Sequence, residues 1–322
     1  MKLEQLRLIV EIARQDYNVS RAAETLDAPQ PLVSRQLKAL ERELGVDLFV
    51  RGRNRLRGPT APGKEILEVA QRLVDDADTI AKIAHDFRDA HRGRLTIATT
   101  HTQARYALPS LIGRFKARYP EVEVTIRQAG PTEIVELVRH GDADMCIGSE
   151  SSEGTDLALF PCYPMQRIVL APPGHPLLGA RRLTLQTLAR YPIITYDAPA
   201  LGRSRLMEAF AAHGLSPKIV LSAIDTDVIK AYVEQGLGIA IVAKLAFDPA
   251  RDRHLRAIDA SHLFEPNTIH LGVRRNDYMR GYVLDFIEMF APQWTRERVQ
   301  SRTGESKAGH HRTARAKTGS RR

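Results

Sequence analysis

The sequence predicts an α/β protein in which a winged helix-turn-helix, a long linker helix and a two-lobed α/β domain follow one another. Three observations predict this order: short helices before an arginine-rich turn, a heptad-spaced apolar stripe, and a long alternation of strands and helices. At 322 residues the chain exceeds the ~100–150 residues of a typical domain. We therefore expect a helix-turn-helix domain over 1–60, a linker helix over 61–90 and an α/β domain over 91–295. Within the last, lobe I comprises 91–165 and 268–295, and lobe II comprises 166–267.

The first sixty residues predict three short helices. An apolar stripe marks the first helix, Asn18 or Ser20 can cap the second, and Pro29 and Pro31 bracket a break before the third. The third helix has one apolar face and ends at Gly45, and its polar face carries Ser34, Arg35 and Lys38. A short helix, a tight turn and a second helix with a polar, basic face are typical of a helix-turn-helix.

An arginine-rich turn follows the third helix. Arg51, Arg53, Arg55 and Arg57 surround a Gly/Asn turn signal, which predicts a hairpin. Such a wing suits phosphates or a narrow minor groove. The alternative, a solvated charged loop, is less favoured directly after a helix-turn-helix pattern.

Residues 62–90 have the periodicity of a long helix. Apolar residues alternate spacings of four and three over three heptads, which predicts a seam against a second subunit: Ile66, Ala70, Leu73, Ala77, Ile80, Ala84 and Phe87. We expect this linker to form a homodimer.

From Arg94 onward strands and helices alternate, which predicts parallel or mixed sheets covered by helices. The expected strands are 94–100, 122–128, 143–149, 167–171, 192–196, 218–223, 237–243 and 268–275. The expected helices are 108–120, 131–141, 202–214, 225–236 and 281–292.

Composition excludes several classes of protein. No apolar run approaches the ~20 residues of a membrane span, and the N-terminus lacks the features of a secretory signal, so we expect a cytoplasmic protein without membrane contact. Cys146 and Cys162 predict neither a disulfide framework nor a metal site. Most of the net charge of +9 comes from 296–322, where nine Lys/Arg face two Glu, so we expect a basic disordered tail there.

The sequence does not favour an enzyme. It has no Gly-rich phosphate loop, HExxH metal motif or GxSxG elbow, and nothing groups its Ser, His and Asp residues. We expect neither a cofactor nor a metal. A solute-binding protein is the other alternative, and the helix-turn-helix argues against it.

Two stretches resemble a known family. AAETLDAPQPLVSRQLKALERELGVDLFVRGR and LRGPTAPGKEIL resemble the signature of LysR-type transcriptional regulators. IATTHTQARYALP, PCY, GRS, DTDVIKAYVEQGLGIAIVA and YVLDFI…FAP resemble the CysB-like branch, which governs sulfur assimilation and cysteine biosynthesis. The resemblance spans residues 1 to about 295. It implies a periplasmic-binding-protein-like sensor domain, dimers paired into a homotetramer, and an effector between the lobes that alters DNA bending and RNA polymerase contact.

By position the resemblance places eight residues on the DNA-binding surface: Ser20, Gln30, Pro31, Ser34, Arg35, Lys38, Arg51 and Arg53. Gln30 and Arg35 are candidates for base contacts, because an amide pairs with adenine and a guanidinium with guanine. Lys38 and the wing arginines are candidates for phosphate contacts.

The segment ATTHTQARY indicates an effector site. Thr100, Thr102 and Gln103 lie where a strand ends and a helix starts, and free N–H groups at a helix start attract anions. Spacing alone favours simple helix caps, whereas in the CysB-like branch the corresponding residues bind sulfate or an acetylserine-type inducer. His101 can join them or pack elsewhere, and Arg203 is either an anion ligand or a charge at a helix start.

Three positions depart from the branch pattern. Ser149 and Leu201, which precedes Gly202, stand where the branch has threonine, and Met165 stands where it has tryptophan. We expect an anion site to survive these changes, while the rest of the effector differs. Sulfate, thiosulfate, acetylserines and adenosine phosphosulfate are candidates, and regulation of sulfonate or sulfate-ester use is the alternative.

Overall fold

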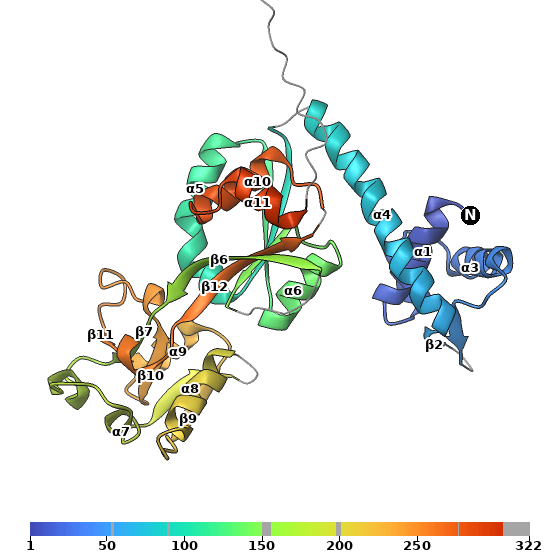
Figure 1. Ribbon diagram of the computed structural model, residues 1–322. Coiled ribbons are helices and arrows are strands. Elements are labelled where there is room, and N and C mark those ends of the chain that lie inside the picture. Colours follow the sequence, from blue (N-terminus) through green and yellow to red (C-terminus); the bar gives the residue numbers. More distant parts are fainter. Residues whose placement is uncertain (53–54, 89–90, 150–155, 198–200, 276, 305–322) are drawn as a thin grey trace, which may run out of the picture. The chain divides into compact units, whose positions relative to one another are not determined.

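The computed structural model describes residues 1–52, 55–88, 91–149, 156–197, 201–275 and 277–304. The chain forms two compact units, residues 1–90 and residues 91–322. Figure 1 shows the helical N-terminal unit and the two sheets of the second unit.

The N-terminal unit is a winged helix-turn-helix followed by a long helix. It comprises α1 (Leu3–Arg14), α2 (Val19–Thr25), α3 (Gln30–Leu44), β1 (Phe49–Arg51), β2 (Leu56–Pro59) and α4 (Ala61–Arg88). The Asn18 side chain caps α2 by accepting from the N–H groups of Ser20 and Arg21 at 3.1 and 3.2 Å. Gly45 ends α3 with a φ of 71°, which a residue with a side chain rarely adopts. The predicted hairpin is confirmed, and its tip, Arg53 and Asn54, lies outside the described residues.

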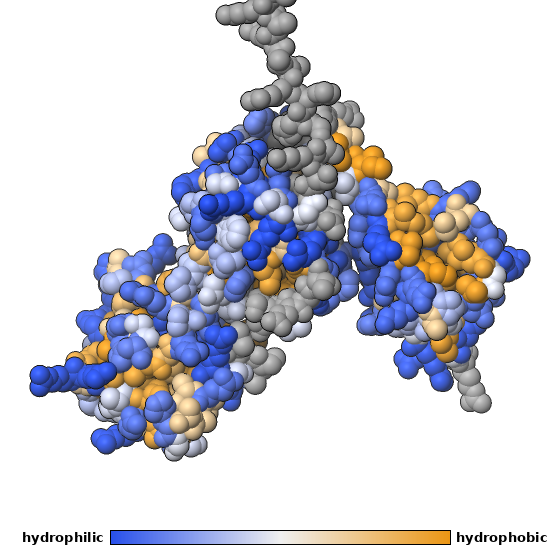
Figure 2. Space-filling view, in the orientation of Figure 1, coloured by the Kyte–Doolittle hydropathy of each residue, from blue (hydrophilic) through white to orange (hydrophobic). Residues whose placement is uncertain are grey.

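The apolar stripe of α4 faces two ways, so the prediction of a single intersubunit seam was partly wrong. Ala70 and Val74 are buried in the core of their own unit, and Ile66 packs against it. By contrast Leu73 is 42% exposed and Ile80 is 69% exposed. The helices of this unit cover one flank of α4, which leaves only the other flank for a partner. Figure 2 shows apolar surface over α1 and α4.

Lobe I of the second unit is built on a five-stranded sheet with the order β4-β3-β5-β12-β6. Its strands are β3 (Gly93–Thr99), β4 (Val122–Gln128), β5 (Met145–Gly148), β6 (Leu157–Met165) and β12 (Asn267–Arg274). One face packs against α5 (Leu108–Arg118), α10 (Gly281–Phe290) and α11 (Arg296–Thr303). The other face packs against α6 (Pro131–Arg139).

Lobe II is built on a second five-stranded sheet with the order β11-β7-β10-β8-β9. Its strands are β7 (Arg167–Ala171), β8 (Ile193–Tyr196), β9 (Ile219–Ala223), β10 (Ile239–Ala243) and β11 (Arg256–Asp259). The helices α7 (Leu185–Leu188) and α8 (Leu201–Ala211) border one core, and α9 (Thr226–Glu234) borders another. The chain crosses between the lobes twice, from β6 to β7 and from lobe II into β12.

The sequence did not predict β6 or β11. The segment of β6 contains Pro161 and Pro164, which argue against a central strand, yet β6 pairs only at the edge of its sheet. A proline is tolerated there because an edge strand has one side without ladder hydrogen bonds.

The prediction of disorder from residue 296 was also wrong for its first part. Residues 296–303 form α11, whose Val299 and Thr303 are buried at 1% exposure. Arg296 pairs with Asp285 of α10, and Asp285 also accepts a hydrogen bond from Tyr119. Although burial raises the pKa of Asp285, the bonds from Tyr119 and Arg296 hold that pKa below its usual value. The remaining predicted tail, 305–322, lies outside the described residues.

In the part of the chain that the structure describes, no helix is both long and apolar enough to cross a membrane. Nor do three or more His, Cys, Asp or Glu side chains gather there as a metal site would require. Burial raises the pKa of the Cys146 and Cys162 thiols to about 11 and about 12, so both are protonated, unreactive side chains.

Candidate effector and DNA-binding sites

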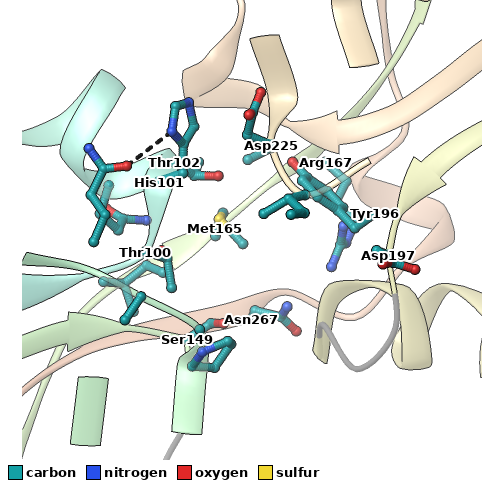
Figure 3. Close-up of a pocket in the computed structure, with 18 residues that line it drawn as sticks. Thr100, His101, Thr102, Ser149, Met165, Arg167, Tyr196, Asp197, Asp225 and Asn267 are labelled. Atoms are coloured by element: carbon teal, nitrogen blue, oxygen red, sulfur yellow. Dashed lines mark hydrogen bonds between the residues drawn. The ribbon is translucent and has the colours of Figure 1, made fainter. Parts of the chain in front are cut away.

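A cavity of about 580 Å³ lies between the two sheets of the second unit, and Figure 3 shows the side chains that line it. Lobe I contributes the segment 100–103, the segment 128–131 and Ser149, and lobe II contributes Tyr196, Asp197, Ile224, Asp225 and Ala243. The two crossovers contribute Met165, Arg167, Asn267 and Ile269. Five of the seven effector residues predicted from the sequence line this cavity: Thr100, Thr102, Gln103, Ser149 and Met165.

The predicted helix start is present at one wall of the cavity. β3 ends at Thr99, and helical backbone runs from His101 into a π-helical turn, Gln103–Ala107, and then α5. The first helical hydrogen bonds run from the N–H groups of Gln103 and Ala104 to the Thr100 carbonyl, both at 3.1 Å. The N–H groups of His101 and Thr102 precede them and have no helical acceptor, which is the geometry that attracts an anion.

Gln103 is held in one orientation. Its side chain is 1% exposed, and its Oε1 accepts a hydrogen bond of 2.5 Å from the Tyr163 hydroxyl. The amide nitrogen is therefore the group that Gln103 can offer to a ligand as a donor.

The opposite wall carries Tyr196, a residue that sequence analysis missed. Its hydroxyl lies 2.6 Å from Thr226 Oγ1 and also hydrogen-bonds with the side chain of Thr102 in lobe I. Burial raises the pKa of Tyr196, so its hydroxyl is protonated and can donate. Thr102 thus connects the helix start to the other lobe.

The two crossovers supply further residues that sequence analysis missed, Arg167 and Asn267, exposed by 4% and 1% respectively. Burial lowers the pKa of the Arg167 guanidinium, and the nearby charge of Arg205 lowers it further. An arginine at the head of the buried strand RIVLA is a signal that sequence analysis could have used, because buried arginines need a partner. No comparable signal pointed to Asn267. The sequence predicted the strand that follows it, but not that the chain crosses between the lobes at this residue.

The cavity wall as described does not test the remaining predicted effector residues. Leu201 and Gly202 begin α8, but their side chains lie outside the described residues. Arg203 donates to the Tyr196 carbonyl at 3.3 Å and to Ser222 Oγ at 3.2 Å, and its role as an anion ligand or as a charge at a helix start stays a prediction.

His101 lies at the edge of the cavity in a cluster that joins the lobes. Its Nδ1 is 3.2 Å from Gln128 Oε1, and its Nε2 is 3.4 Å from Asp227 Oδ2. Asp227, on α9 of lobe II, also accepts hydrogen bonds from Arg105 and Tyr106 of lobe I. Although burial raises the pKa of Asp227, these bonds hold that pKa below its usual value.

The DNA-binding prediction concerns α3, whose apolar face is buried through Val33, Leu37 and Leu40. Gln30, Pro31, Arg35 and Lys38 are exposed and Ser34 is half-buried, so the predicted contact face is open to solvent. Ser20, Gln30 and Arg51 line one groove together with Arg55, another of the wing arginines, and with Arg21, which the prediction had not included.

Arg51 also has a structural partner. Its Nη2 lies 2.5 Å from Oε2 of Glu41, a buried side chain of α3 whose Oε1 accepts from the Leu48 N–H at 3.0 Å. This ion pair fixes the wing to α3. Arg53, the other predicted wing contact, lies outside the described residues.

Comparison with known proteins gives the same division of the chain. Residues 3–64 match the bacterial regulatory helix-turn-helix proteins of the lysR family, and residues 88–295 match the LysR substrate binding domain. The chain is 46% identical to the HTH-type transcriptional regulator SsuR of Burkholderia cenocepacia over 293 residues, which cover 91% of this chain and 95% of SsuR. It is 43% identical to the regulator CysB of the same organism over 310 residues, which cover 96% of this chain and 99% of CysB.

Two solved structures are also similar to this chain. The crystal structure of the cofactor-binding domain of the Cbl transcriptional regulator is similar with a TM-score of 0.64 and 43% identity, and covers 67% of this chain and 95% of that one. A full-length OxyR variant from Pseudomonas aeruginosa has a TM-score of 0.66 at 23% identity, covers 91% of this chain and 97% of that one, and shares the fold. With a helix-turn-helix unit, a two-sheet sensor and relatives over almost its whole length, the chain belongs to the LysR family of transcriptional regulators.

Proposed function

We propose that this LysR-type regulator controls genes of sulfur assimilation or cysteine biosynthesis in response to a small sulfur-related anion bound between its lobes. The observation that carries the proposal is that Thr100, Thr102 and Gln103, which the sequence indicated as an anion site, line one cavity at a helix start. The resemblance of the sensor to the CysB-like branch supports the sulfur assignment. The similarity to SsuR keeps sulfonate or sulfate-ester use as the alternative.

The proposal also covers the N-terminal unit, which would bind promoter DNA. The protein would act in the cytoplasm. In this proposal α3 enters the major groove, Gln30 and Arg35 contact base edges, and Ser20, Pro31, Ser34, Lys38, Arg51 and Arg53 contact the surrounding backbone. Two such units act together in a homodimer that pairs into a homotetramer, and an activator of this kind also contacts RNA polymerase. The protein uses no cofactor and catalyses no reaction.

The test of the effector site is calorimetry on full-length protein with sulfate, thiosulfate, O-acetylserine and adenosine phosphosulfate. Thr102→Val keeps the volume of the side chain but removes its hydroxyl. A hydrogen bond to a charged group contributes about 1.5–3 kcal/mol, so we expect affinity for the bound anion to fall roughly ten- to a hundredfold.

Thr226→Val is the matched control. It removes the other hydroxyl that Tyr196 contacts, from a fully buried residue that is not part of the cavity wall. We expect a smaller loss of affinity for this variant. The Thr102 side chain makes no helix-cap hydrogen bond in the structure. If Thr102→Val binds each anion as tightly as the parent, its hydroxyl serves only the contact with Tyr196 and the effector site lies elsewhere.

A further inference from the structure

Asn267 lines the cavity and carries a buried side-chain donor that has no hydrogen-bond partner among the described residues. The residue is 1% exposed at the start of β12, and Figure 3 shows it among the lining residues. Its Nδ2 has no hydrogen-bond partner among the residues that the structure describes. A buried donor without an acceptor is destabilising, and such groups in native structures usually have a role.

The orientation of this amide is fixed by chemistry. Arg205 Nη1 lies 2.6 Å from Asn267 Oδ1. A guanidinium only donates, so the oxygen of the amide must face Arg205 and the nitrogen must face away from it. The side chain therefore presents a donor, and not an acceptor, at this wall.

The surroundings favour an oxygen-bearing group at this donor. The buried Arg167 guanidinium lines the same cavity, and the charge of Arg205 lowers its pKa. An acceptor with negative charge would offset the repulsion between these two cations. A tetrahedral sulfur oxyanion has five heavy atoms, whereas the cavity, at about 580 Å³, has the size of sites that hold larger organic ligands.

We propose that Asn267 determines the specificity of the effector site, and that the effector is an organic anion with a second oxygen acceptor. One end of this ligand lies at the helix start beside Thr100 and Thr102. The second oxygen accepts a hydrogen bond from Asn267 Nδ2 near Arg167. Arg205 is a positioning residue that acts through Asn267. This inference rests on the effector site proposed above.

The sharpest test exchanges the donor for an acceptor. Asn267→Asp keeps the shape of the side chain and an oxygen for Arg205, but places a second oxygen where Nδ2 was. Two probes carry the same sulfonate and differ at the other end: sulfoacetate ends in a carboxylate and taurine ends in an ammonium. Inorganic sulfate is the probe for the helix start alone.

Calorimetry on the full-length protein gives three dissociation constants for each variant. We expect the parent to bind sulfoacetate more tightly than both sulfate and taurine. Asn267→Asp should shift the ratio of sulfoacetate to taurine affinity at least tenfold toward taurine, because a site built around one hydrogen bond rejects a mismatched group strongly. Arg205→Leu, which lets the amide rotate, should reduce the same ratio by a smaller factor without reversing it.

Gln128→Glu is the matched control. It adds the same charge to the cavity at the side of His101. Because sulfoacetate has a net charge of −2 and taurine has none, it should lower the ratio of sulfoacetate to taurine affinity, but by a much smaller factor than Asn267→Asp. Thermal unfolding identifies any variant that fails to fold, and in that case the Arg205→Leu ratio decides.

Two results would overturn the inference: an unchanged ratio in Asn267→Asp, or a parent that binds sulfate at least as tightly as sulfoacetate. If instead Thr102→Val leaves the binding of every anion unchanged, the proposed effector site itself is wrong. The two failures are therefore distinguishable.

Discussion

Arg35 and Lys38 lie almost one turn apart on the exposed face of α3, and the two side chains suit different parts of DNA. A guanidinium can donate two parallel hydrogen bonds to guanine, whereas an ammonium acts on phosphate as a point charge. Arg35→Ala should therefore lower specific binding by about 1–3 kcal/mol and relax base preference at one position of each half-site. Lys38→Ala, the control, should weaken specific and random duplexes alike and reduce the salt dependence.

Fluorescence anisotropy with a duplex of the promoter and a scrambled duplex, at several salt concentrations, measures both effects. Equal losses on the two duplexes for Arg35→Ala would mean that this residue contacts only the backbone.

At the level of single residues, the sequence predicted the part of the cavity wall that comes from one short segment of the chain. Thr100, Thr102 and Gln103 are adjacent, so one strand end and one helix start position all three. Arg167 and Asn267 are a hundred residues apart and line the same cavity only because each lies where the chain crosses between the lobes. The spacing of apolar residues does not tell which distant segments lie side by side. The sequence therefore could not predict that these two residues belong to one site.

Among the elements, the apolar pattern of α4 correctly predicted a long helix, but its interpretation as a contact with a second subunit was incomplete. A helix over 61–90 was predicted and α4 spans Ala61–Arg88, but its apolar stripe is shared between the core of its own unit and the solvent. Apolar residues have the same spacing whether they contact the same chain or another, so the sequence could not separate the two. The helix α11 was missed for a related reason: it is short and strongly charged, and tertiary contacts stabilise it, among them the pair of Arg296 with Asp285 and the packing of Val299 in the lobe I core.

The exposed flank of α4 supports a prediction about assembly. Leu73 is 42% exposed, and in a dimer that uses this flank Leu73→Asp would place a carboxylate in an apolar contact. A loss of about 3 kcal/mol corresponds to a roughly hundredfold weaker association. Sedimentation velocity on full-length protein should therefore show a smaller species.

Leu178→Asp, at a leucine of lobe II that is 37% exposed, makes the same chemical change outside the linker. It should leave the sedimentation coefficient unchanged. A Leu73→Asp variant that sediments like the parent would remove this flank of α4 from the subunit interface.

At the scale of the whole sensor unit, the same short segment forms one wall of the cavity and contacts the other lobe. Residues 100–107 provide the helix start at the cavity, and they also provide Thr102, Arg105 and Tyr106, which contact lobe II. In the proposed mode of binding, a ligand at the helix start would therefore contact a segment that already joins the lobes. This arrangement was not predictable from the sequence, because Asp227 is more than a hundred residues from its partners.

Asp227 offers the means to separate closure from ligand contact, because it joins the lobes without lining the cavity. Asp227→Asn keeps an acceptor for Tyr106 but removes the charge that Arg105 faces at 3.2 Å. The carboxylate is 42% exposed, so solvent screens the pair, and such exposed pairs contribute about 0.2–1 kcal/mol. We expect effector affinity to fall up to roughly fivefold for all anions alike, with faster amide hydrogen exchange over residues 101–107 and 226–234.

Asp259→Asn is the control, since Asp259 belongs to lobe II and its carboxylate accepts hydrogen bonds from the neighbouring Ser261. Unchanged exchange in both segments, together with unchanged affinity, would mean that the Asp227 contacts do not stabilise the arrangement of the lobes that the structure shows.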